Sequence, residues 1–139
     1  MVEDNVLVEH YHLLKKGIDI ETEEGRILRA EDYTEPSPES KMYAFCSDTA
    51  FYPQVTEDIG GADLLYHEAT FTERYQDRAL ATMHSTAAQA AEIATKAKVK
   101  KLIIGHFSAR FDSGEDHLSE ALEVFPETQL AEDGDEFRL

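Results

Sequence analysis

Short apolar runs alternate with longer amphipathic stretches from residue 41 onward. The runs KMYAFC, ADLLY and KKLIIG each end in polar residues, as expected for strands that enter a core and leave it at their carboxyl ends. Between them lie an acidic helical stretch near Pro53 to Gly60 and an alanine-rich stretch that opens with Thr86 and Gln89, a capping-box pair. A last helix near Glu115 to Val124 precedes an expected edge strand at residues 128–134. This alternation predicts an α/β fold.

The first forty residues have a different pattern. VLVEHYHLLKKG and IDIETEEGRILRA alternate weakly, and Gly17 and Gly25 stand where strands would turn, which predicts short strands around a hairpin. The segment EDYTEPSPES is typical of a connector. We therefore expect residues 1–40 to be a β-hairpin and connector region and residues 41–139 to be the α/β part, together forming one structural unit.

Composition limits the classes of protein that remain. The chain has 139 residues, 42% of them hydrophobic, which suits one compact core. It lacks a long apolar run and the features of a signal peptide, and Cys46 is its only cysteine, so we expect no membrane segment and a cytoplasmic location. The net charge of −16 disfavours nucleic-acid binding unless metal cations or a basic surface on another chain supply positive charge.

Polar residues collect at three expected strand ends: SDT at 47–49, HEAT at 67–70 and GHFSAR at 105–110. The carboxyl ends of strands are where open α/β sheets build their sites. Asp48 is either a turn former or a carboxylate that bridges two metal ions. His106, which follows a very apolar strand, is either a structural histidine or a metal ligand.

The remaining polar residues also have two interpretations. His67 and Glu68 form either a surface pair or, if buried, an oriented acid or base. His84, in the HST turn at residues 84–86, either closes the loop before the helix or donates a proton to a leaving oxygen. Ser108 and Arg110 either bind a phosphate or make surface contacts.

Other motifs are weak or missing. His10 and His12 alternate on an expected strand and are a weak metal signal, and His117 is expected to be a solvated helix residue. The sequence has no glycine-rich phosphate loop, HExxH pair, paired CxxC or GxSxG elbow, so kinase-like, zincin, zinc-ribbon and esterase-like functions lose support.

Four segments in order, YAFCSDTAF, DLLYHEATF, MHSTAAQAAEIA and KKLIIGHFSAR, followed by LAEDG, resemble the second half of ribonuclease Z of the metallo-β-lactamase superfamily. The resemblance covers residues 41–134 strongly and the region before it more loosely. It implies the C-terminal half of an αββα sandwich in which each half contributes one sheet. It also implies that two zinc ions lie between the halves and that precursor tRNA is the substrate.

The resemblance also implies roles for single residues. Asp48 matches the bridging aspartate and His106 the late histidine ligand. His84 matches the histidine that assists protonation of the leaving group, and Glu68 matches the carboxylate that orients it, so that Asp48, Glu68 and His84 form the expected catalytic set. His67 and Thr86 are expected to support these residues from behind.

The sequence departs from the family in one respect that affects mechanism. The HxHxDH motif, a further histidine ligand and the arm that clamps tRNA belong to the family's N-terminal half and do not occur here. Zinc sites usually have three or four protein ligands, and this chain offers two, Asp48 and His106. We therefore expect weak or no metal binding and no cleavage by this chain alone. The expected partners are the N-terminal half and, through an apolar sheet face without cover, further copies of the chain. Two alternatives remain: a non-catalytic interaction module, and an enzyme of the same superfamily that acts on another phosphoester or a thioester.

Overall fold

The computed structural model describes residues 6–139, which divide into two compact units at the boundary between Ser40 and Lys41. The first five residues of the expected hairpin region lie outside the described residues. The sequence predicts a single structural unit, whereas the structure has two. Two units form because residues 35–43 are exposed, and no helix or strand occurs between Tyr33 and Tyr43 to bring side chains into a core.

The first unit is a small helical and hairpin unit. It contains η1 (Val8–His10), α1 (Tyr11–Leu14), the antiparallel strands β1 (Ile20–Glu21) and β2 (Ile27–Leu28), and α2 (Ala30–Tyr33). Its core is formed by four buried side chains, those of Leu14, Ile20, Leu28 and Ala30. The hairpin at residues 18–30 is confirmed, whereas the strand expected in residues 6–17 is wrong, since residues 8–14 are helical.

This difference removes the weak metal signal of the HYH sequence. Residues two apart share a face on a strand but lie about 200° apart around a helix. His10 and His12 therefore do not face the same way, and the Nδ1 atom of His12 bonds locally to the Glu9 carbonyl oxygen, 2.7 Å away.

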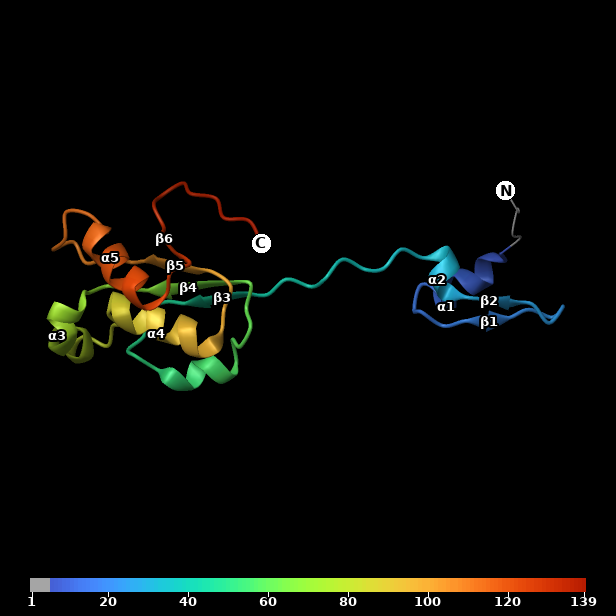
Figure 1. Cartoon of the computed structure of the whole chain (residues 1–139), viewed down its shortest axis with the longest axis horizontal. Helices are drawn as coiled ribbons and strands as arrows, with labels where there is room; N and C mark the ends of the chain where they lie inside the picture. Colours follow the sequence, from blue (N-terminus) through green and yellow to red (C-terminus); the bar gives the residue numbers. More distant parts are fainter. Residues whose placement is uncertain (1–5) are drawn as a thin grey trace. The chain divides into compact units, whose positions relative to one another are not determined.

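The second unit is built on a four-stranded parallel sheet in the order β3-β4-β5-β6 (Figure 1). The strands are β3 (Tyr43–Cys46), β4 (Leu64–Glu68), β5 (Leu102–Gly105) and β6 (Thr128–Leu130). Cys46 pairs with His67, and His67 with Ile104, so β3, β4 and β5 end side by side. The three expected strands and the edge strand are confirmed.

Helices cover one face of this sheet (Figure 1). They are α4 (Ala87–Ala97) and α5 (Glu115–Val124), and η2 (Pro53–Glu57) packs on α4. The short helices η3 (Glu73–Tyr75) and α3 (Gln76–Ala81) follow β4 in the chain and pack on each other. The expected capping box starts α4: the Thr86 side chain accepts from the Gln89 amide, and the Gln89 side chain accepts from the Thr86 amide. No helix among residues 6–139 is both long enough and apolar enough to cross a membrane.

Alanine makes the close packing of α4 on the sheet possible. The helix buries four alanines and Ile93 completely, against Leu65, Leu102 and Ile104. Small side chains bring the helix near the strands without voids, and interiors are packed this densely throughout. Burial of this one face stabilises the unit.

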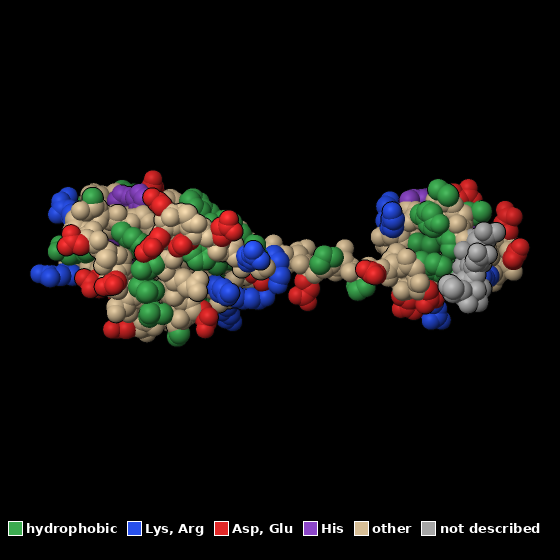
Figure 2. All heavy atoms as spheres, turned by 90° about the horizontal axis from the view of Figure 1, so that it is seen from above, with side chains coloured by type: hydrophobic (Ala, Val, Ile, Leu, Met, Phe, Trp, Pro, Cys, Tyr) green, Lys and Arg blue, Asp and Glu red, His purple; other side chains and the backbone are tan. Residues whose placement is uncertain are grey.

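The opposite face of the sheet carries exposed aromatic side chains. On β3, Ala44 and Cys46 point to the helices, while Tyr43 and Phe45 are 51% and 63% exposed. Phe45 stacks on Tyr66 with ring centroids 4.8 Å apart. The sequence predicts a fully buried strand, but β3 is buried on one face only. Figure 2 shows hydrophobic side chains at the surface among acidic ones. The expected exposure of apolar sheet surface is found on β3 alone, since Leu64 of β4 and Ile103 of β5 on the same face are buried.

His117 is buried, contrary to the expectation of a solvated residue. It lies on the inner face of α5 and packs between Phe107 and Phe111, with ring centroids 4.8 and 4.4 Å from its own. Because its neighbours in the sequence are acidic and polar, the sequence does not indicate that His117 faces the core. Burial lowers the pKa of His117 below its usual value and so favours the neutral ring.

His117 and the buried His67, whose pKa burial also lowers, predict a loss of stability in mild acid. The unfolded chain takes up protons below a pH of about 6.5 that the folded chain excludes, so the free energy of unfolding falls as pH falls. In His117→Phe less of the free energy of unfolding should be lost between pH 7 and pH 5 than in the wild type, because one of the two buried imidazoles is gone. Urea unfolding between pH 5 and pH 7 measures the free energy of unfolding of both proteins. The same dependence of this free energy on pH in the two proteins would contradict the prediction.

Candidate metal centre

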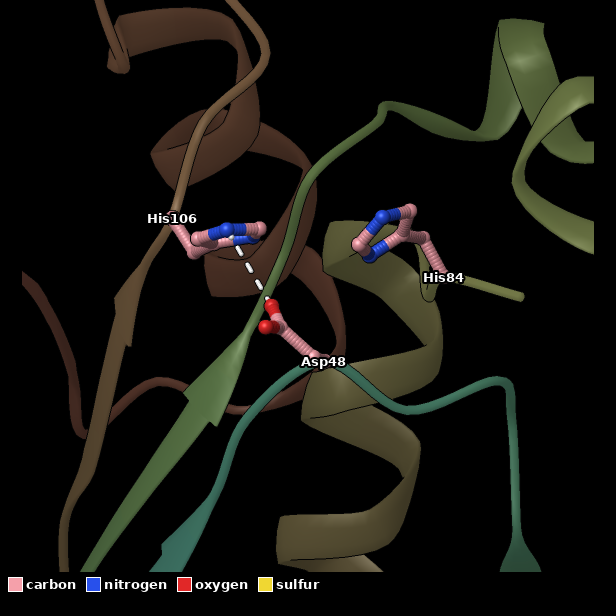
Figure 3. A group of neighbouring side chains, drawn as sticks. All are labelled: Asp48, His84 and His106. Carbon is pink, nitrogen blue, oxygen red and sulfur yellow. Dashed lines mark ion pairs between the residues drawn. The ribbon is translucent and has the colours of Figure 1, made fainter. Parts of the chain in front are cut away.

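The loops that follow β3 and β5, and the turn before α4, bring three possible metal ligands together. Asp48, His84 and His106 each offer one ligand atom, and these atoms lie within 4.8 Å of one another. The Asp48 carboxylate is 3.1 Å from Nε2 of His106, and the rings of His84 and His106 are 5.4 Å apart at their centroids. Figure 3 shows the Asp48 carboxylate directed at His106, with the His84 ring facing the same space.

Two of these residues have unusual backbone conformations. Asp48 and His106 have φ angles of 50° and 62°, and Met83, which precedes His84, also has a φ of 62°. Residues other than glycine rarely adopt this left-handed backbone conformation, and each one lowers the stability of the fold by roughly 1–2 kcal/mol. Strain of this kind gathers at functional sites, where the surrounding structure holds it. The loops thus aim these side chains at some expense of stability.

Glu68 lies behind the cluster and is completely buried at the end of β4. Its Oε1 atom accepts hydrogen bonds from the Thr49 amide (3.0 Å) and from Nδ1 of His84 (2.7 Å). Its Oε2 atom accepts from both the amide (3.0 Å) and the hydroxyl (2.6 Å) of Thr70. One carboxylate therefore connects the SDT, HEAT and HST segments.

These bonds determine the protonation state of Glu68. Burial acts to raise the pKa of the carboxyl, but hydrogen bonds from the Thr70 hydroxyl and His84, with those from the Thr70 and Ser85 amides, outweigh burial and hold the pKa below its usual value. Glu68 is thus an ionised acceptor. Charge-assisted hydrogen bonds of this kind are stronger than those between neutral groups.

The same bonds orient both imidazole rings. His84 donates its Nδ1 proton to Glu68, which leaves the Nε2 lone pair free. The Thr70 hydroxyl has one proton and gives it to Glu68, so it accepts from Nδ1 of His106, 2.9 Å away. Nε2 of His106 then faces Asp48. Histidines that ligate metals are commonly held through their other ring nitrogen in this way.

Backbone hydrogen bonds join the same loops. Phe71, directly after the HEAT segment, forms a short parallel bridge with Thr86 of the HST turn: the Phe71 amide donates to the Ser85 carbonyl oxygen (3.3 Å), and the Ala87 amide donates to the Phe71 carbonyl oxygen (2.9 Å). The Ser85 hydroxyl donates to the Thr49 carbonyl oxygen (2.7 Å). Thr70 and Ser85 were not assigned roles from the sequence, and only their place inside the HEAT and HST segments could have indicated them.

The expected supporting residues lie apart from the cluster. His67 is buried and its Nδ1 atom bonds to the Glu68 carbonyl oxygen at 2.7 Å, while its ring lines a small pocket beside Cys46. Thr86 caps α4 and its hydroxyl donates to Glu73. Both residues are therefore placed to stabilise the elements that carry the site, and their described contacts do not include Asp48, His84 or His106.

The expected phosphate-binding residues follow His106. Ser108 is half-buried and its amide donates to the Thr70 carbonyl oxygen at 3.0 Å, which ties this loop to the HEAT segment. Arg110 is exposed, and within residues 6–139 its guanidinium pairs with no carboxylate. Phosphate binding by these two residues stays a prediction.

Comparison with known proteins identifies relatives of the chain. No family profile matches the sequence. Ribonuclease Z of Bacteroides thetaiotaomicron is 48% identical over 126 residues, which are 91% of this chain and 40% of that protein. Ribonuclease Z of Parabacteroides distasonis is 51% identical over 121 residues, 87% of this chain and 40% of that protein. The chain matches part of a ribonuclease Z. The resemblance found in the sequence is thereby confirmed, and the chain spans about 40% of the length of these curated relatives.

Solved structures support the fold. The metallo-β-lactamase fold protein YhfI of Bacillus subtilis superposes with a TM-score of 0.64 at 24% identity, over 69% of this chain and 39% of that one. A diphosphatase of the PhnP family superposes with a TM-score of 0.50 at 26% identity, over 71% of this chain and 36% of that one. The expected fold class, an α/β unit of the metallo-β-lactamase type, is confirmed.

The contacts of Glu68 predict its effect on stability. Glu68→Ala leaves the half-buried Thr49 amide and the buried amide and hydroxyl of Thr70 without an acceptor, so the free energy of unfolding is expected to fall by about 3 kcal/mol or more. Glu68→Gln, which keeps one carbonyl oxygen, should cost less. Urea unfolding measures both, with the exposed Glu57→Ala as control; a loss in Glu68→Ala no larger than in the control would refute the role.

Proposed function

We propose that this chain forms part of a metal-dependent endoribonuclease that removes the 3′ trailer from precursor tRNA by phosphodiester hydrolysis. The observation that carries the proposal is the convergence of Asp48, His84 and His106 in front of buried Glu68. It occurs in a chain about half identical to ribonuclease Z proteins.

The donor set suits zinc. A carboxylate oxygen and neutral imidazole nitrogens are ordinary zinc ligands, and Asp48 and His106 are the residues that we assign to hold it. Manganese and cobalt accept the same ligands. Bound metal would supply an activated water and neutralise charge on the phosphate. Two ligands fall short of the three or four that zinc requires, so the complete centre with two ions needs residues from elsewhere.

The residues of this chain contribute orientation and a proton. Glu68 fixes the ring of His84 through Nδ1 and so directs Nε2 towards the cluster, where it can carry a proton. We assign that proton to the leaving oxygen of the phosphodiester. Ser108 and Arg110 are assigned to the phosphate, since a guanidinium matches its oxygens well. The products are a trimmed tRNA with a 3′ hydroxyl and the released trailer.

The partners follow from charge and exposed surface. A chain with a net charge of −16 needs positive charge from elsewhere to bind tRNA, and we assign this to the N-terminal half of the enzyme. The exposed Tyr43 and Phe45 favour association, either with that half or with further copies of this chain. We place the reaction in the cytoplasm because precursor tRNA is its substrate. The same surface supports the second candidate function, a non-catalytic interaction module.

Reconstitution separates the two candidates. The chain is expected to be inactive alone and to cleave a 3′-extended precursor tRNA with zinc only after a separately made N-terminal half with the HxHxDH motif is added, because that half supplies the remaining ligands. Gel analysis of the products measures cleavage. Cleavage by the chain alone would contradict the assigned ligand set, and a complex that forms without any cleavage would favour the interaction module.

Asp48→Ala tests the metal assignment within that mixture. The side chain is 69% exposed, so the variant should keep its fold while cleavage falls on the order of 100-fold or more. The exposed Asp58→Ala is a matched control. Circular dichroism checks folding and initial rates check activity. Full activity of the Asp48→Ala mixture would refute the role of this carboxylate.

A further inference from the structure

Glu120 is half-buried and accepts hydrogen bonds from two other segments of the chain. It lies on α5, outside the cluster of possible ligands. Both of its carboxylate oxygens accept from the Glu73 amide, at 3.0 and 2.8 Å, and Oε1 also accepts from the Ala88 amide at 2.9 Å. Neither donor belongs to its own helix. These hydrogen bonds hold the carboxylate in one position, which an acidic residue that serves solubility alone would not need.

The two donors lie at the starts of helices. The Glu73 amide begins η3, directly after the HEAT segment, and the Ala88 amide lies in the first turn of α4, directly after the HST turn. The first amides of a helix have no acceptor within the helix, and a carboxylate beside them is favourable. Glu120 thus satisfies two such helix starts with one charge.

These two starts are the ends of the short bridge between the HEAT and HST segments. Between Glu120 and the candidate site lie the bonds from Phe71 to Ser85 and from Ala87 to Phe71. At the other end of the bridge, Glu68 holds Thr70 and His84. Two carboxylates, Glu68 and Glu120, therefore close the same pair of segments from opposite ends.

We propose that Glu120 is a positioning residue for His84 and Thr70. By fixing the start of η3 against the start of α4, it keeps the bridge in register, and the bridge places the His84 ring on Glu68 and the Thr70 hydroxyl on His106. Sites need a supporting layer of hydrogen bonds to hold their side chains in a productive geometry. The functional value of this placement rests on the proposed nuclease function, but the placement itself does not.

The test compares four forms of the chain by amide hydrogen exchange in NMR, without metal or RNA: wild type, Glu120→Ala, Glu120→Gln and the exposed Glu123→Ala of the same helix. The amides of Phe71 and Ala87 bond to each other's segments and not to Glu120, so they report how far its effect extends. We expect both to exchange at least ten times faster in Glu120→Ala. Glu120→Gln keeps one acceptor oxygen but places an amide nitrogen, which cannot accept, where the other oxygen accepts from Glu73, so its rates should lie between those of the wild type and Glu120→Ala. Glu123→Ala should keep wild-type rates.

The Leu65 amide, which bonds across the sheet to Lys101, is the internal reference and should be unchanged. If the exchange rates of Leu65, Phe71 and Ala87 all rise equally, Glu120 contributes only to general stability. If the rates of Phe71 and Ala87 do not change, Glu120 does not position the site. Either outcome overturns the proposal. If Glu120→Ala does not fold, Glu120→Asp takes its place, since its shorter side chain cannot reach both amides. Failure of the proposed nuclease function alone would leave these rates as expected.

Discussion

A buried negative charge at the end of β4 determines the arrangement of the candidate site. An ionised carboxylate inside a protein is costly unless it is fully hydrogen-bonded. Glu68 meets this requirement by drawing donors from Thr49, Thr70 and His84, each from a different loop. The loops therefore cannot move independently. Their side chains reach the same space because one acceptor has to be satisfied, and Asp48, His84 and His106 come within ligand distance as a consequence.

The parallel sheet provides the frame for this arrangement, and its stability is largely independent of the site. The packing of α4 on β4 and β5 is apolar and lies on the face away from the exposed aromatic residues. Because that core stabilises the unit, the loops at the strand ends can hold Asp48 and His106 in left-handed conformations. The site is thus a strained feature on a stable support, as many active sites are.

The sequence predicted the features that depend on local pattern. The strands β3, β4 and β5 and the capped helix α4 follow from apolar runs and from a capping pair, and the convergence of Asp48 and His106 follows from their places after parallel strands. It failed where tertiary contacts decide. The alternation in HYH is typical of a strand, but these residues lie in a helix that buries Leu14 in the core of the first unit.

Other failures have the same origin. His117 is flanked by charged and polar residues, so only the packing of α5 reveals that it is buried. Glu120 accepts from an amide 47 residues away, and no local pattern in the sequence distinguishes it from a surface residue. Ser85 donates to a carbonyl oxygen 36 residues away, and only its place in the HST segment sets it apart. The sequence predicts that Glu68 orients His84, and the two side chains are hydrogen-bonded, but its place as the common acceptor of three loops required the three-dimensional structure.

The most direct measurement is the tautomeric state of the histidine rings in the metal-free chain, obtained from long-range proton–nitrogen NMR spectra near pH 7.5. If Glu68 is the ionised acceptor that orders the site, the neutral His84 ring must carry its proton on Nδ1, with a free Nε2, and the His106 ring must do the same through Thr70. A His84 ring protonated on Nε2, with Nδ1 free, would contradict the account, because Glu68 would then not hold it.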